Sequence, residues 1–385
     1  MVRARMGRGP GRLVVVGAVA TMLLAGCTGT DDQGEERPDG GETGDTGDTA
    51  PTLLDEHEPL RDLAPDGVVI GTAAAGGGHF GSGNDPFTVD EPYRALVGSE
   101  FNSVTPENQL KWEYVHPQRD EYAFEAADDI VDFAEENGMD VRGHTLMWHN
   151  QNPTWLEEGD FTPDELREIL REHITTVVGR YAGRIQQWDV ANEIIDDSGN
   201  LRTQENIWLR ELGPEIVADA FRWAHEADPD ALLFLNDFNA ETVNAKTNAY
   251  LALAEDLLAQ GVPVHGFGAQ AHLSLEYGAP GDSVRTVLQS FADLGLATAI
   301  TELDVRMELD GEPTPEQLTQ QAEHYRDVIE GCLAVEGCGS ITVWGFTDKY
   351  SWVPGWFTGF GAATLTEMDY TVRPAYDAVA EALAG

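Results

Sequence analysis

From residue 60 to the C-terminus, short apolar runs alternate with longer stretches in which apolar residues recur every three or four positions. The short runs are rich in small and β-branched residues, as in buried strands, and the longer stretches have the period of amphipathic helices. The pattern predicts eight strands, at residues 68–72, 102–105, 141–148, 185–190, 232–237, 266–271, 297–302 and 341–344. The predicted helices include 126–137, 163–181, 216–227, 247–260, 282–294, 315–335 and 374–383.

Strands that alternate with helices predict a parallel sheet with helices packed outside it. Eight such units in a chain of 385 residues fit the α/β class and a single (β/α)8 TIM barrel. A doubly wound sheet is the alternative, but the glycines from Gly71 to Gly78 lack the spacing of a dinucleotide-binding turn. We therefore expect one barrel domain, over residues 55–385.

The N-terminal 54 residues differ in composition from the rest. Four arginines precede an apolar run at 13–24 that is too short to span a bilayer comfortably, which predicts an export signal over residues 1–26. The sequence Leu-Ala-Gly-Cys at 24–27 resembles the lipobox of bacterial lipoproteins, which implies a lipid on Cys27 and anchoring on the outer face of the cell membrane. An ordinary secretory peptide is the alternative. Residues 27–54 are rich in Gly, Asp and Thr and predict a disordered acidic tether.

The charge and the cysteine content indicate which partners the protein can bind and in which compartment it works. A net charge of −45 excludes a nucleic-acid-binding surface and disfavours anionic partners. Only three of the 23 basic residues are lysines. A codon preference for arginine and a surface suited to high salt are the two alternative explanations. If Cys27 carries lipid, an exported protein would pair the remaining Cys332 and Cys338. We expect no cofactor, and no metal-binding motif of diagnostic spacing occurs.

Acidic residues stand where predicted strands end. In the stretch 297–306, strand alternation puts Glu302 and Asp304 on one face, with Ile300 completing it. Two carboxylates on a buried face cost free energy unless hydrogen bonds or a catalytic task compensate. Glu193 stands in the same way just after the fourth predicted strand. Because barrel active sites lie at the carboxyl ends of the strands, we expect these acids to share one site.

Glu193 and Glu302 lie on the fourth and seventh strands, so their carboxyl groups are predicted to face each other across the barrel mouth. Glycoside hydrolysis requires such a pair: one protonated acid and one ionised nucleophile, in environments that separate their pKa values. Asn192 can donate to a sugar hydroxyl, while His272 and Asp304 can keep the nucleophile ionised. For one glutamate alone, a satisfied ion pair would be the better interpretation; two at strand ends favour catalysis.

Other side chains near the strand ends suit a sugar, because indole rings pack on the apolar faces of pyranoses and amides bind hydroxyls. Glu107 and Lys111 are four residues apart, and an ion pair on a helix surface is the simpler interpretation. The scarcity of lysine argues for a place in the site instead. The remaining candidates are Trp148, Trp344 and Trp352 as platforms and Asn108, Gln151 and Gln270 for hydroxyls.

These stretches resemble the catalytic domain of bacterial family 10 glycoside hydrolases, the endo-1,4-β-xylanases, from about residue 66 to residue 383. The motifs occur in family order: Glu-Asn-x-x-Lys-Trp at 107–112, Gly-His-Thr-Leu-x-Trp-His at 143–149, Trp-Asp-Val-x-Asn-Glu at 188–193, Gln-x-His at 270–272, Ile-Thr-Glu-Leu-Asp at 300–304 and Val-Trp-Gly-x-Thr-Asp-Lys-Tyr-Ser-Trp at 343–352. The resemblance implies hydrolysis of internal β-1,4-xylosidic bonds in xylan, with retention of the anomeric configuration by double displacement.

The resemblance also assigns roles to individual positions. It implies Glu193 as the acid/base and Glu302 as the nucleophile. Catalytic support would come from Asp189, Asn192, His272 and Asp304. The cleaved sugar would be surrounded by His144, Trp148, Asn192 and Gln270, and the next xylose on the non-reducing side would be bound by Glu107, Asn108, Lys111 and Gln151, with Trp344 and Trp352 closing the cleft.

Two departures from the family pattern stand out. Phe238 occupies a position where the family usually has Tyr, which removes a hydroxyl on the leaving-group side, and Phe234 and Gly266 replace a second disulfide seen in some relatives. The expected partners are xylan and xylo-oligosaccharides, with no nucleic acid, with membrane contact only through Cys27, and with a monomeric state. The alternatives are cleavage of other β-1,4-glucans or cellobiosides on the same site, and a lipoprotein that binds oligosaccharides without cleaving them.

Overall fold

The structure, a computed structural model, describes residues 53–77 and 84–385. The predicted signal segment, Cys27 and the tether as far as residue 52 lie outside the described residues. Leu53 and Leu54 belong to the folded domain, because Leu54 is buried and its N–H donates to the carbonyl of Tyr370. The folded domain therefore includes residues 53 and 54, which the sequence assigned to the tether.

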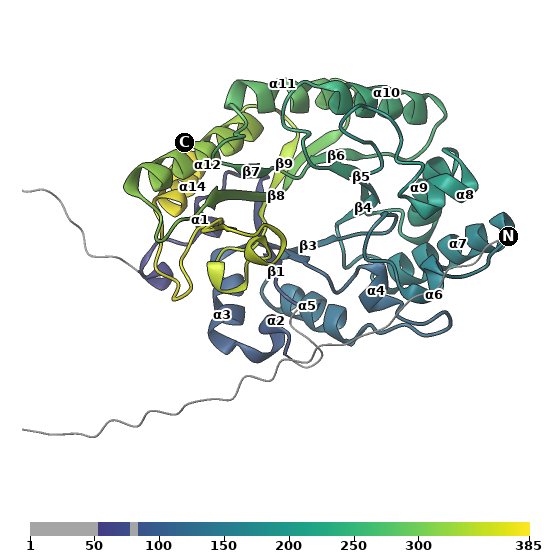
Figure 1. The fold of residues 1–385 in the computed structure, drawn as a ribbon, viewed down its shortest axis with the longest axis horizontal. Coiled ribbons are helices and arrows are strands. Elements are labelled where there is room, and N and C mark those ends of the chain that lie inside the picture. The colour runs from purple at the N-terminus through teal and green to yellow at the C-terminus, as the bar shows by residue number, and fades with distance from the viewer. Residues whose placement is uncertain (1–52, 78–83) are drawn as a thin grey trace, which may run out of the picture. The chain divides into compact units, whose positions relative to one another are not determined.

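Eight parallel strands form a closed barrel (Figure 1). The barrel strands are β1 Val69–Ala74, β2 Ser103–Pro106, β3 Asp140–Gly143, β4 Gln187–Asn192, β5 Leu232–Asp237, β6 Gly266–Ala269, β8 Ala297–Glu308 and β9 Cys338–Val343. Each strand pairs with the next, and pairing of β9 with both β1 and β8 closes the ring. The predicted (β/α)8 barrel is confirmed.

Helices surround the barrel and cover the outer faces of its strands (Figure 1). The helices in the described part of the chain are α1 Leu60–Leu63, α2 Pro86–Val89, α3 Glu91–Glu100, α4 Trp112–Val115, α5 Glu125–Glu136, α6 Thr154–Glu157, α7 Pro163–Arg180, α8 Ile207–Leu212, α9 Ile216–Ala227, α10 Ala245–Ala259, α11 Gly281–Ala292, α12 Pro315–Leu333, α13 Val353–Trp356 and α14 Pro374–Ala384. The two longest, α7 and α12, begin at capping boxes, formed by Thr162 with Glu165 and by Thr314 with Gln317. Among the described residues, no helix is long and apolar enough to cross a membrane.

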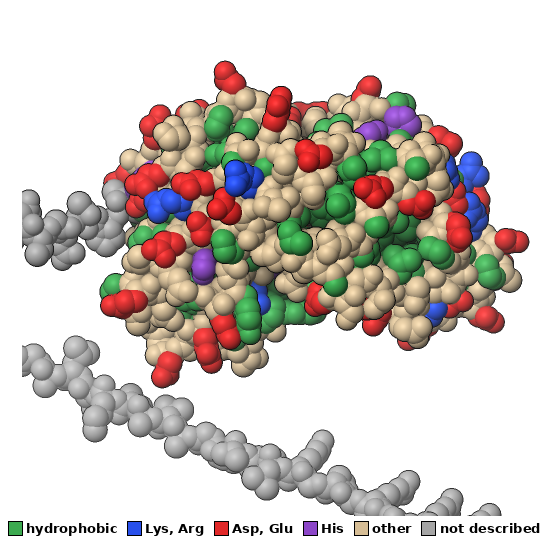
Figure 2. All heavy atoms as spheres, turned by 90° about the horizontal axis from the view of Figure 1, so that it is seen from above, with side chains coloured by type: hydrophobic (Ala, Val, Ile, Leu, Met, Phe, Trp, Pro, Cys, Tyr) green, Lys and Arg blue, Asp and Glu red, His purple; other side chains and the backbone are tan. Residues whose placement is uncertain are grey.

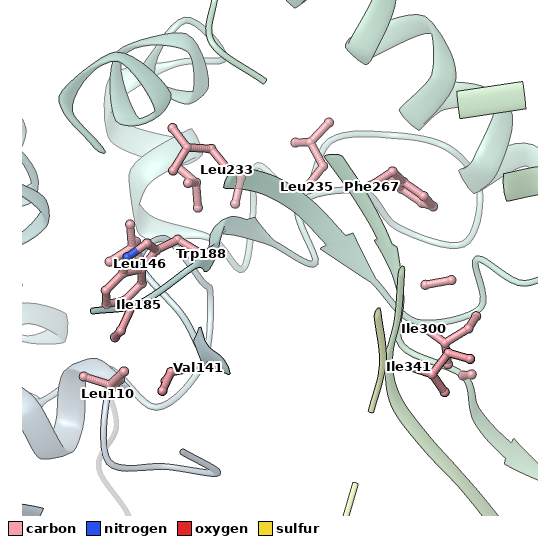
Figure 3. Close-up of a cluster of buried hydrophobic side chains, with 14 of the residues drawn as sticks. Leu110, Val141, Leu146, Ile185, Trp188, Leu233, Leu235, Phe267, Ile300 and Ile341 are labelled. Atoms are coloured by element: carbon pink, nitrogen blue, oxygen red, sulfur yellow. The ribbon is translucent and has the colours of Figure 1, made fainter. Parts of the chain in front are cut away.

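The hydrophobic core lies between the strands and the helices. Figure 3 shows Leu233, Leu235 and Phe267 on the side of β5 and β6 that faces the helices, and all three are fully buried. Phe267 stacks on Phe291 of α11 with the ring centres 3.8 Å apart. A disulfide between Cys332 and Cys338 ties the end of α12 to the start of β9, as predicted from the sequence.

The strand predicted at 141–148 stops at Gly143, the last residue of β3. The chain then turns over the barrel mouth, with a cis peptide between His144 and Thr145. Leu146 and Met147 donate to backbone carbonyls of β4 without continuing the β3 ladder. Their apolar, strand-like pattern therefore reflects burial in a loop.

The strand predicted at 297–302 does not end at Glu302, because β8 continues to Glu308. Its outer half pairs with two short strands above the barrel mouth, β7 His272–Ser274 and β10 Phe360–Gly361. These short partners have too few residues for a distinct sequence pattern. The nucleophile candidate thus stands in the middle of a long strand.

Candidate active site

The two glutamates stand at the C-terminal end of the barrel. Glu193 directly follows β4 and has a positive φ of 53°, a backbone conformation that is strained for a residue with a side chain. Its N–H donates to the carbonyl of Asn236 on β5 at 2.9 Å, which fixes that conformation. Glu302 lies on β8 and is only 4% exposed.

Strict alternation along β8 fails at Glu302. Thr301 Oγ1 donates to Asn236 Oδ1 at 2.7 Å, and Glu302 Oε1 accepts from Asn236 Nδ2 at 2.9 Å, so two consecutive residues reach one side chain. The pairing of β8 with β9 shifts register between Ile300 and Leu303, which turns Glu302 toward the mouth. Ile300 does not complete the face of Glu302 as predicted, but packs beside Ile341 in the core (Figure 3).

Three side-chain amides connect the two carboxyl groups. Gln270 Nε2 donates to Glu193 Oε1 at 3.1 Å and to Asn192 Oδ1 at 3.2 Å. Asn236 Nδ2 donates to the same Asn192 oxygen at 2.9 Å and to Glu302 Oε1. The structure thus brings Glu193, Glu302, Asn192 and Gln270 together, as the sequence predicted. Asn236 was not predicted, although it stands at the end of a strand beside an aspartate.

A histidine and an aspartate hold Glu302 from the other side. His272 Nε2 lies 3.2 Å from Glu302 Oε2, and His272 Nδ1 lies 3.0 Å from Asp304 Oδ2. Burial acts to lower the pKa of His272, but the charge of Asp304 and the hydrogen bonds to both carboxylates raise it to about 10. Trp352 Nε1 donates to Asp304 Oδ2 at 2.8 Å and so keeps this carboxylate oriented. The structure thus places His272 and Asp304 beside Glu302, and their supporting roles stay a prediction.

The environment of Glu302 favours its ionised form. Burial alone would raise the pKa of this carboxyl, but the charges of His144 and His272 and the hydrogen bond from His272 lower it to about 2. His144 Nδ1 lies 3.9 Å from Glu302 Oε1 and 2.9 Å from Asp189 Oδ2. Asp189 in turn accepts from Arg142, and both are nearly fully buried. Arg142 was missed in the sequence, although its place two positions before His144, on one face of the strand predicted at 141–148, is a signal that could have found it.

The residues predicted to bind the next sugar form a second cluster. Lys111 Nζ and Gln151 Nε2 donate to Asn108 Oδ1 at 3.1 and 3.0 Å, and Glu107 Oε2 accepts from the N–H of Gly76 at 3.3 Å. The segment 107–111 is not helical, and Glu107 and Lys111 are buried, so the interpretation as an ion pair on a helix surface is wrong. Burial raises the pKa of Glu107 to about 7, although the nearby lysine charge opposes this.

Aromatic rings border both clusters. The Lys111 ammonium lies 5.1 Å from the ring centre of Trp148 and 5.9 Å from that of Trp344. Trp344 packs edge-on against His144, and Trp352 packs against His272. A small cavity lined by Glu107, Trp344 and Trp352, among others, lies between them. The predicted tryptophans therefore border the site, and Trp344 itself is almost fully buried.

Two further features near Glu193 were not predicted. His149 Nδ1 lies 3.9 Å from Glu193 Oε2; it ends one of the quoted motifs, which is the signal that could have found it. Burial lowers the pKa of His149, although Glu193 opposes the shift. On the other side, Lys246 Nζ lies 3.7 Å from the ring centre of Phe238 and bonds to Asp237 and Asp197. No group of His, Cys, Asp and Glu in the described part of the chain is arranged to hold a metal ion.

Two glutamates face each other at the mouth of a (β/α)8 barrel, and the surrounding amides and histidines keep one of them ionised. This arrangement defines a glycoside hydrolase of the two-carboxylate class. Comparison with known proteins gives the particular family. The chain belongs to glycosyl hydrolase family 10, whose family model matches residues 63–382.

Several proteins and solved structures are similar to this chain. Endo-1,4-beta-xylanase B of Thermotoga neapolitana is 45% identical over 324 residues, which cover 84% of this chain and 91% of that protein. The crystal structure of native xylanase 10B from Thermotoga maritima is also 45% identical, with a TM-score of 0.79, and covers 84% of this chain and 98% of its own. Xylanase 10B from Thermotoga petrophila RKU-1, solved in complex with xylobiose, is 44% identical, with a TM-score of 0.79 and coverage of 84% and 97%.

Proposed function

We propose that this protein is a retaining endo-1,4-β-xylanase that cleaves internal bonds of xylan and binds xylo-oligosaccharides. The single observation that carries the proposal is the pair of glutamates joined by the Asn192, Asn236 and Gln270 amides, with one member ionised by its surroundings. The xylanase names of the relatives and the xylobiose in one similar structure support the choice of substrate. For retention we expect the two carboxyl groups about 5–5.5 Å apart.

In the first step, Glu302 attacks the anomeric carbon, the glycosidic bond breaks, and the acid Glu193 gives its proton to the leaving oxygen. In the second step, Glu193 takes a proton from water, the water oxygen bonds to the anomeric carbon, and the ester to Glu302 breaks. The amide of Asn192 can bond to a sugar hydroxyl in both steps. His272, itself held by Asp304, fixes the carboxylate of Glu302, so the nucleophile needs little reorientation between the first step and the second.

The test is hydrolysis of xylohexaose followed by nuclear magnetic resonance of the new reducing ends. The first product should be the β-anomer, and Glu302→Gln should lower the rate at least about a thousandfold while the protein stays folded. Carboxymethyl-cellulose should be cleaved far more slowly. An α-anomer formed first would overturn retention, preferential cleavage of cellulose would favour the glucanase alternative, and binding without products would favour the oligosaccharide-binding lipoprotein.

We also propose that the protein is exported and held by a lipid on Cys27 at the outer face of a bacterial membrane, where it acts as a monomer. The support is the arginine-rich start, the apolar run and the lipobox-like sequence. Expressed with its full leader, the protein should partition into the detergent phase of a Triton X-114 extract, and Cys27→Ser should move it to the aqueous phase. The double variant Cys332→Ser, Cys338→Ser is the control and should stay in the detergent phase.

A further inference from the structure

A second cavity lies outside the site built around the two glutamates. Its volume is about 620 Å³, and it is bounded by the turn after β7, the outer end of β8, the start of α12 and β10. Ligand sites in proteins commonly have volumes of about 300–1,000 Å³. None of the residues assigned to the active site lines it, so it is a separate feature of the molecule.

One face of β8 leads from the nucleophile to this cavity. Val305 and Met307 are fully buried in the core, so Arg306 and Glu308 lie on the opposite face of the strand and reach the cavity. At a rise of about 3.3 Å per residue, Arg306 stands about 13 Å along the strand from Glu302, and Glu308 about 20 Å. A bound chain of a few sugar units would cover that distance.

The order of the barrel strands places the cavity on the leaving-group side. In the ring of eight, β8 is opposite β3 and β6 is opposite β2. The residues predicted to bind the non-reducing part of the substrate, among them Lys111 and Gln151, follow β2 and β3. A cavity beside β7 and β8 therefore lies across the mouth from them, where the departing part of the chain would extend.

The lining of the cavity suits a neutral sugar. It carries the carboxylates of Glu276, Glu308, Asp310 and Glu312, and within the described residues none of these four forms an ion pair with a basic side chain. They also form no metal-binding group among those residues. Carboxylates accept hydrogen bonds from hydroxyls strongly, and as a set they repel anions. At the rim, the ring of Tyr277 is 68% exposed and offers a stacking surface.

We propose that this cavity is an accessory subsite that binds a neutral pentose on the leaving-group side of the substrate, with Tyr277 as its stacking platform. The proposal rests on the xylanase function proposed above and adds a substrate preference to it. The pentose has two possible sources, a xylose further along the main chain or an arabinose branch. A glucuronate branch is disfavoured because the carboxylates outnumber the single arginine, Arg306.

The test compares Tyr277→Ala with the unaltered protein on three substrates: 4-nitrophenyl β-xylobioside, which is too short to reach the cavity, linear xylohexaose, and an arabinose-branched xylo-oligosaccharide. We expect kcat/KM on the aryl xylobioside to stay within about twofold and to fall about tenfold on a substrate that fills the cavity. A fall on xylohexaose identifies a main-chain xylose, and a fall on the branched substrate alone identifies an arabinose. Leu232→Ala, an exposed apolar residue at the start of β5, is the control and should change none of the three.

Equal values on all three substrates, or an equal loss on all three, would overturn the subsite. If the proposed function is wrong, the unaltered protein will cleave none of the three substrates, and this result differs from the loss of the subsite alone. In that case calorimetric titration of xylohexaose and of the arabinose-branched oligosaccharide into Glu302→Gln, with and without Tyr277→Ala, still tests the cavity. A Kd that Tyr277→Ala leaves unchanged for both ligands would also overturn the subsite.

The charge of the cavity has a test of its own. Replacing Glu308 and Glu312 by Gln should raise kcat/KM at low salt on glucuronate-branched oligosaccharides severalfold more than on neutral ones. The control variant replaces Asp66 and Asp230 by Asn; both are exposed, precede β1 and β5 at the opposite end of the barrel, and change the net charge equally. An equal gain in the control would show that the overall charge, and not the cavity, selects the substrate.

Discussion

A single histidine connects Glu302, the proposed nucleophile, to the tryptophans that border the site. His272 contacts Glu302 with one ring nitrogen and Asp304 with the other, and Asp304 accepts from the indole of Trp352. The positive ring lowers the pKa of Glu302 and neutralises part of the repulsion between the two carboxylates. Such an arrangement orients the attacking oxygen before the substrate arrives.

The pair of Glu302 and His272 gives the folded protein a pH window. The pKa of Glu302 is lowered on folding, so its contribution to stability is complete above its ordinary pKa of 4.5 and is lost as the pH falls through about 2. The pKa of His272 is raised, so its contribution is complete below 6.5 and is lost as the pH rises through about 10. Between these limits the nucleophile stays ionised.

His272→Asn should therefore raise the pKa of Glu302, because a neighbouring positive charge and a hydrogen-bond donor are removed. We expect the acid limb of kcat/KM on an activated aryl β-xylobioside to move up by about one to three pH units. His225→Asn, on α9, is the matched control and should leave the profile unchanged. An unmoved acid limb in His272→Asn would contradict the role of this histidine.

Among single residues, the sequence predicted the ionisable side chains that stand at strand ends. Glu193, Glu302 and His272 each follow a buried apolar run, and a charged or ionisable side chain there has few structural explanations. Asn236 and Arg142 were missed because their partners come from other strands. The shift of register in β8, which turns Glu302 toward the mouth, depends on pairing with β9 and has no local pattern either.

Helix α10 supports the tip of β4, which is followed by Glu193, the proposed acid/base. Tyr250 OH donates to Asp237 Oδ2 at 2.6 Å and accepts from the N–H of Ile194, the residue after Glu193, at 3.0 Å. The strained backbone of Glu193 is thus held on one side by Asn236 and on the other by this hydroxyl. Tyr250 is a positioning residue for the acid/base, because it acts through the backbone.

Tyr250→Phe should lower the free energy of unfolding by about 1–3 kcal/mol, because the buried Ile194 N–H loses its acceptor. It should also reduce kcat more on xylohexaose than on 2,4-dinitrophenyl β-xylobioside, whose leaving group needs little protonation. Tyr376→Phe removes an equally buried hydroxyl that bonds Glu58 and Glu100, so it should cost stability without any dependence on the leaving group. Equal leaving-group dependence in both variants would contradict a positioning role.

Among the elements, the long helices, which show several turns of a periodic pattern, were predicted best. The helices at 163–181 and 216–227 agree with α7 and α9 within one residue, because caps and periodicity are both local signals. The short strands β7 and β10 were missed, since two or three residues carry no period. The loop after β3 has the apolar pattern of a strand because its residues are buried.

The whole molecule carries its negative charge on the folded surface. Figure 2 shows acidic side chains spread over the face in view, with few basic ones among them. The net charge of −45 repels an anionic polymer at long range unless salt screens it, and the Debye length falls from about 30 Å at 0.01 M to about 3 Å at 1 M. The acidic surface thus favours the approach of neutral xylans over anionic ones to the barrel mouth.

Activity on glucuronoxylan should therefore rise severalfold from 0.01 M to about 0.5 M NaCl, whereas kcat/KM on neutral xylohexaose should change little. Initial rates on both substrates over a salt series give the measurement. A parallel response of the two substrates would show that salt acts on the enzyme alone. Thermal unfolding in the same series distinguishes a surface suited to high salt, for which Tm falls at low salt, from a codon preference, for which Tm stays constant.

The placement of the lysines has a practical consequence for attaching this enzyme to a support. Lys111 and Lys246 are buried in contacts near the two sides of the active site, and Lys349 is partly exposed and bonds to Asp90. Coupling reagents that react with amines would meet almost no accessible lysine side chain on the described domain. Coupling through carbodiimide-activated carboxylates would instead attach the protein at many points, and it would remove negative charge as it did so.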